Sequence, residues 1–83
     1  MDYHARKEFE SEKRKLNTQI RKADQRIAEY KKEKEAIHQD FMKDPMLWSQ
    51  ERQARHDELV KLLEKEELLW LDLQQKAEAM EKE

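Results

Sequence analysis

The sequence contains no glycine, no cysteine and a single proline, Pro45. Loops that cradle phosphates need glycine for close backbone approach and for positive φ angles, so the absence of glycine excludes nucleotide sites of the P-loop and Rossmann types. The absence of cysteine excludes disulfide bonds, thiolate zinc sites and thiol nucleophiles. A chain without thiols suits the cytoplasm, and we expect a cytoplasmic location.

Long apolar runs are also missing. The longest, Leu68 to Leu71, has four residues, which is too short for a membrane span or a signal peptide, and we expect no membrane partner. Of the 83 residues, 46% are charged and 36% are hydrophobic, which is too polar for a thick core. Because the apolar residues nevertheless recur regularly, we predict one domain, residues 1–83, made of long helices with a narrow seam between them.

Two heptad patterns define this seam. In both halves of the chain, apolar residues recur in steps of three and four, as in a coiled coil. The predicted seam of the first helix contains Phe9, Lys13, Leu16, Ile20, Ala23, Ile27, Tyr30, Lys34, Ile37 and Phe41. The predicted seam of the second contains His56, Leu59, Leu63, Glu66, Trp70, Leu73, Ala77 and Met80.

The single proline predicts where the chain turns back. Pro45 cannot continue a helix and forces the preceding residue into an extended conformation. We therefore expect a first helix over about 3–42, a turn over 43–48 and a second helix over about 49–82. The predicted fold is all-α, a two-helix antiparallel coiled-coil hairpin.

Two residues of the turn region are candidates to cap the second helix. Asp44 precedes the proline, and the Ser49 hydroxyl is placed to accept from the N–H of residue 51 or 52. The apolar trio of Met46, Leu47 and Trp48 is expected to pack locally as a plug at the hairpin end, with a partner contact as the alternative.

No constellation of residues predicts catalysis. Glu35 and His38 have the Glu-x-x-His spacing of di-iron bundles, but such a site needs a second copy of the motif, which is missing. His56 falls in the seam and is better interpreted as a packed imidazole. We expect no enzyme activity, no metal and no cofactor in this chain.

Positive charge gathers on the first helix. Four cations fall at heptad positions b and c, one heptad apart, and form a patch facing away from the second helix. These residues, with a fifth cation that follows them, are Arg14, Lys15, Arg21, Lys22 and Arg26. We interpret them as a surface for backbone phosphates of a nucleic acid, either rRNA, tRNA or DNA. The alternative is a solvated helix face, since the formal net charge of the chain is -2.

The second helix has a wider apolar face than a two-helix seam requires. Leu62 and Leu69 form a flanking stripe at heptad position g. This stripe leaves open an alternative function, a protein–protein adaptor or a homodimer in which two hairpins form a four-helix bundle.

Several of these features resemble the C-terminal coiled-coil domain of the ABC-F ATPases, the Uup-like proteins. The matching positions over residues 12–80 are Asp40, Phe41, Asp44, Pro45, Trp48, Trp70 and Leu73. Two features depart from the family pattern: Leu69 stands where an arginine is usual, and the preceding lysine-rich linker is absent. The resemblance implies a larger cytoplasmic protein whose two ATP-binding cassettes hydrolyse ATP while the hairpin contacts the ribosome or a nucleic acid. A helical arm of a tRNA synthetase is an alternative with similar architecture.

Overall fold

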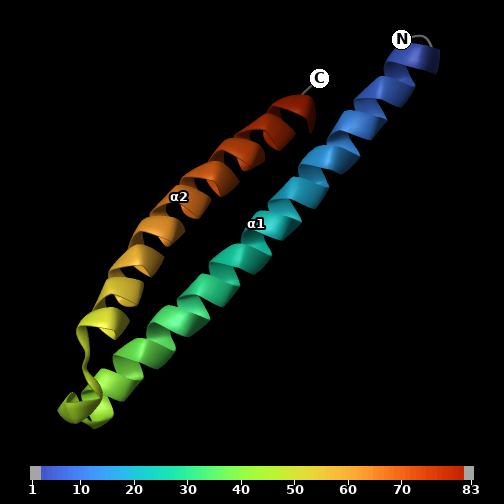
Figure 1. Ribbon diagram of the computed structural model, residues 1–83. Helices are drawn as coiled ribbons and strands as arrows, with labels where there is room; N and C mark the ends of the chain where they lie inside the picture. Colours follow the sequence, from blue (N-terminus) through green and yellow to red (C-terminus); the bar gives the residue numbers. More distant parts are fainter. Residues whose placement is uncertain (1–2, 82–83) are drawn as a thin grey trace.

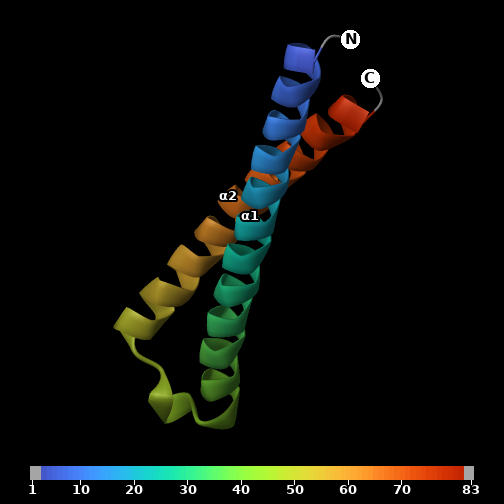
Figure 2. The same cartoon turned by 90° about the vertical axis from the view of Figure 1, so that its right-hand side faces the viewer.

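The computed structural model describes residues 3–81, which form two long helices joined by a short turn (Figure 1). Helix α1 spans Tyr3–Lys43, the 3-10 helix η1 spans Pro45–Leu47, and α2 spans Gln50–Glu81. The two long helices run antiparallel, so the start of α1 and the end of α2 lie toward the same end of a rod of 65 × 17 × 14 Å (Figure 2). This architecture confirms the predicted all-α hairpin. Residue 82, where we expected α2 to end, lies outside the described residues.

The chain leaves α1 as the proline requires. Asp44 is extended, with φ −149° and ψ 103°, and its backbone N–H donates to the Asp40 carbonyl at 3.0 Å. The Asp44 carboxylate accepts from the backbone N–H of Met46 at 2.9 Å. Asp44 therefore caps the 3-10 turn that begins with Pro45, and does not cap α2.

Ser49 is the residue that caps α2. Its hydroxyl accepts from the backbone N–H of Arg52 at 3.2 Å, and its carbonyl accepts from the N–H of Gln53 at 2.9 Å. Trp48 lies between the 3-10 turn and Ser49 and is extended, with φ −66° and ψ 136°. Between residues 3 and 81 no residue has a positive φ angle, so this turn reverses the chain without needing glycine.

The core is the narrow seam that the heptads predict. Each of the predicted seam positions is buried or half-buried, and none is exposed. Ala23 and Leu59 are completely buried, and Ile37, Leu63 and Leu73 are nearly so. The rest of the two helices is mostly in contact with solvent.

Ion pairs across the seam show how the two helices are aligned. Arg26 pairs with Glu66 in the middle of the hairpin, and Arg52 pairs with Asp40 beside the turn, each with an N–O distance of 3.0 Å. Helix α1 has 41 residues and α2 has 32, a difference of about 14 Å at 1.5 Å per residue. The first turns of α1 therefore extend past the end of α2 (Figure 1).

The apolar trio at the turn does not form a plug, and this prediction is wrong. The Met46 side chain is 89% exposed and Trp48 is 50% exposed. Beside the turn, the two helices are joined by the ion pair between Arg52 and Asp40, and the trio lies outside this contact. The Trp48 indole is held at this surface because its Nε1–H donates to Gln53 Oε1 at 3.1 Å.

The length and hydropathy of the helices bear on membrane insertion. Within residues 3–81, neither α1 nor α2 contains a stretch that is long and apolar enough to cross a membrane. This finding agrees with the short apolar runs of the sequence.

Candidate nucleic-acid interface

Arginines that face the seam are held by carboxylates of the opposite helix. Besides the two pairs described above, Arg55 of α2 binds Glu33 of α1 through two of its nitrogens, as a bidentate pair. Hydrogen bonds from the Arg55 guanidinium lower the pKa of the Glu33 carboxyl below its ordinary value of 4.5. The same contact raises the pKa of Arg55. These arginines stabilise the hairpin, and each is already paired with a carboxylate of the opposite helix.

The predicted basic patch has a different environment, although it does not all face away from α2 as expected: Lys15 lines a hollow with Met80 of α2, and Lys22 lines one with Leu69 of α2. All of its first four members are exposed, and none forms an ion pair with another side chain of residues 3–81. These members are Arg14, Lys15, Arg21 and Lys22. Because they repeat after seven residues, the two pairs lie about 10 Å apart along the helix axis. The structure therefore leaves four cations available to an external anion.

Arg26, the fifth predicted residue, is placed differently. It is half-buried, and its Nε lies 3.0 Å from Glu66 Oε1 without the alignment of a hydrogen bond. The Glu66 side chain is mostly covered, so this charge depends on Arg26 for its partner. The structure thus separates Arg26 from the other four residues and assigns it to the contact between the helices.

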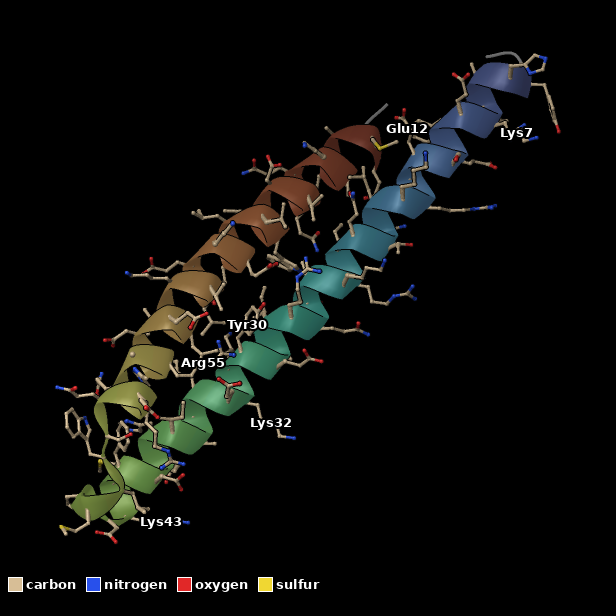
Figure 3. The ribbon with its side chains drawn as sticks, in the orientation of Figure 1. Lys7, Glu12, Tyr30, Lys32, Lys43 and Arg55 are labelled. Atoms are coloured by element: carbon tan, nitrogen blue, oxygen red, sulfur yellow. The ribbon has the colours of Figure 1, made fainter. Side chains whose placement is uncertain are left out.

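Further lysines extend the patch along α1. Lys32 follows Arg14 by 18 residues, which is five helical turns, so the two lie on the same side of the helix about 27 Å apart. Lys7 precedes Arg14 by seven residues and Lys43 follows Lys32 by eleven, which places each about 20° from exact alignment on the same side. Figure 3 shows Lys7, Lys32 and Lys43 pointing away from α2. Sequence reasoning did not place Lys32 in the patch because it compared positions one heptad apart and did not use the 18-residue repeat. Lys7, one heptad before Arg14, could have been found by the heptad comparison.

At one end of the row, cations gather around a shallow hollow. Arg14 lines it together with Tyr3, Arg6, Lys7, Glu10 and Ser11, and its volume is about 370 Å³. Three cations and one acid thus border the hollow. Acids do occur elsewhere on the helix, but the balance at this point is positive, which favours an anion.

The histidines and carboxylates do not converge. Glu35 Oε1 accepts a hydrogen bond from Gln39 Nε2 at 2.9 Å, next to the Glu-x-x-His motif that ends at His38. In the part of the chain that the structure describes, no group of three or more His, Asp or Glu side chains could hold a metal ion.

Comparison with known proteins identifies no relative of this chain. No protein-family model matches the chain, and neither a curated protein nor a solved structure matches it. The resemblance to the ABC-F coiled-coil domain therefore rests on the residues of the sequence alone.

Proposed function

We propose that this hairpin is a non-catalytic binding module that contacts the phosphate backbone of a nucleic acid through the outward side of α1. One observation supports the proposal above the others. Arginines on the inner side of the hairpin are paired with carboxylates, whereas Arg14, Lys15, Arg21 and Lys22 have no such partner within residues 3–81. Unpaired, exposed cations in a row can bind phosphates and release the counterions that surround them.

The shape of the surface suggests the kind of nucleic acid. A straight row of cations on a rigid helix offers no pocket for a single base, so binding should depend on the backbone and not on the sequence. The row from Lys7 to Lys43 is about 54 Å long at 1.5 Å per residue, enough to contact successive phosphates of a duplex. We therefore propose a double-helical segment, such as a stem of rRNA or tRNA, as the partner.

The wider setting of the hairpin is a proposal of the same kind. The Asp-Pro turn and the late Trp70 support a place at the end of a cytoplasmic ABC-F ATPase, where the cassettes hydrolyse ATP and the hairpin holds the nucleic acid. In that setting, the function of this chain is contact and positioning.

Binding to a labelled RNA hairpin and to a labelled DNA duplex, each at low and high salt, tests the proposal. If four phosphates are contacted, affinity should fall about a hundredfold between 50 and 200 mM salt. The Arg14→Glu/Arg21→Glu variant should bind at least about tenfold more weakly and show a shallower salt dependence.

A matched variant distinguishes the effect of losing this patch from the effect of changing the net charge. Lys61→Glu/Lys65→Glu changes the charge of the chain by the same amount on the outer side of α2, where both lysines are exposed. We expect it to bind almost as well as the unaltered chain. Equal loss in the two variants, or no binding to either ligand at low salt, would contradict the proposal.

Self-association is a second candidate function, and one observation favours it. Leu69 is 42% exposed and borders a hollow of about 170 Å³ together with Leu73, Arg26 and Lys22. A second hairpin could cover Leu69 and its neighbour Leu62. Analytical ultracentrifugation tests this candidate, because a dimer that Leu62→Gln/Leu69→Gln dissociates would support it and a monomer at high concentration would exclude it.

A further inference from the structure

Helix α2 carries a second set of side chains at helical spacing, outside the seam. We call this set the outer row; it consists of Val60, Glu64, Glu67, Leu68 and Leu71. Leu68 is 69% exposed and Leu71 is 49% exposed. These leucines and the two glutamates line a shallow hollow of about 400 Å³. Positions i, i+4, i+7, i+8 and i+11 form one face of a helix, so the outer row suits a partner helix laid along it.

The surroundings of the two leucines are acidic. Among residues 50–81, helical spacing places four carboxylates and one lysine on or beside the outer row: Asp57, Glu64, Glu67 and Glu78, with Lys61. From α1, the Lys31 ammonium lies 3.8 Å from Glu67, but both side chains are exposed, and such a pair contributes little. A partner that covers the leucines must therefore bring positive charge to this face.

A second copy of this chain does not meet that requirement. The outward side of α1 is basic, but its central members Arg14, Arg21 and Lys32 have no large apolar residue among them to cover Leu68 and Leu71. The outer row of another α2 would bring leucines, but it would also set carboxylates against carboxylates, which is unfavourable. The charge of the surface thus argues against self-pairing through this row.

We propose that the outer row is a docking site for a basic amphipathic helix of another protein. The apolar side chains of that helix would cover Leu68 and Leu71, and its lysines or arginines would pair with Glu64 and Glu67. This site uses α2 and a cationic partner, whereas the proposed nucleic-acid surface uses α1 and an anionic partner. The two proposals can therefore fail separately.

Binding of two synthetic helical peptides tests this site. Both would have about 18 residues, or five turns, with the same leucine stripe, and would carry either lysine or glutamate on the polar side. We expect the lysine peptide to bind the hairpin and the glutamate peptide not to bind, as measured by fluorescence anisotropy. Leu68→Gln/Leu71→Gln should weaken binding of the lysine peptide at least about tenfold, and Glu64→Gln/Glu67→Gln should weaken it and reduce its salt dependence.

Two control variants match these changes elsewhere on the surface. Met42→Gln/Leu47→Gln alters two apolar residues near the turn that are 71% and 45% exposed, and Glu29→Gln/Glu35→Gln removes two exposed acids from α1. Both should bind the lysine peptide as the unaltered chain does, with helicity checked by circular dichroism.

Three outcomes would overturn the proposal. The first is failure of the lysine peptide to bind, or binding of the lysine and glutamate peptides with equal affinity. The second is equal weakening by the control variants and by the outer-row variants. The third is a dimer in sedimentation that Leu68→Gln/Leu71→Gln dissociates, since the occupant would then be a second copy.

Discussion

The inner and outer sides of this hairpin use the same residue types for different purposes. On the inner side, arginines such as Arg26 and Arg55 are paired with carboxylates of the opposite helix, and leucines such as Leu59 are buried. On the outer side, Arg21 has no ion pair within residues 3–81 and Leu68 is exposed. The side on which a residue lies therefore indicates whether it holds the fold or is available to a partner.

The largest contrast should appear between two leucines of α2. Leu59→Ala leaves a cavity in a completely buried site and should lower the free energy of unfolding by about 2–5 kcal/mol. Leu68→Ala removes an exposed side chain and should change it by less than about 0.5 kcal/mol. Urea denaturation measures both, and similar losses in the two variants would mean that Leu68 is also covered in solution.

The arginines of α1 should show a smaller contrast of the same kind. Arg26→Gln leaves the mostly covered Glu66 carboxylate without its partner and should lower the free energy of unfolding by about 1 kcal/mol. Arg21→Gln, on the outer side, should leave stability unchanged and weaken nucleic-acid binding. Thermal denaturation and binding assays on the two variants measure these effects. A stability loss in Arg21→Gln equal to that in Arg26→Gln would contradict the division between the two sides.

The smallest effect concerns pH and the pair between Glu33 and Arg55. Because the pKa of Glu33 is lowered in the folded protein, its contribution to stability is present above the ordinary pKa of 4.5 and is lost as pH falls below it. The stability difference between the unaltered chain and Glu33→Gln should therefore shrink from pH 6 to pH 3. Both groups of the pair are exposed, so the change should be small. In an Arg55→Gln background, the Glu33→Gln substitution should have the same effect at both pH values.

The fold could be predicted from the sequence because its signals are local. Heptad spacing identifies the seam, and Pro45 identifies the turn. The plug failed because the contact beside the turn, between Asp40 and Arg52, depends on how the two helices are aligned across the turn. The exposure of Met46 depends on how η1 lies against the helices and is not visible in its neighbours along the chain.

The candidate site was predicted less completely for a related reason. Arg26 and Lys22 look alike in the sequence, and only the packing of α1 on α2 shows that Arg26 is paired with a residue 40 positions away. Lys32 could have been found from the sequence, because a repeat of 18 residues places it in line with Arg14. The outer row shows the same limit, since Leu68 and Leu71 could be recognised as lying outside the seam while their exposure depends on the packed structure.

Chemical-shift mapping by NMR with a duplex RNA as ligand tests the central claim most directly. Resonances from residues on the outward side of α1, from Lys7 through Arg14 and Arg21 to Lys32, should shift on titration and recover at high salt. Those of Lys61 and Lys65 on the outer side of α2 should not move. Shifts concentrated on α2, or shifts that persist at high salt, would contradict the proposal that the outward cations of α1 bind phosphates.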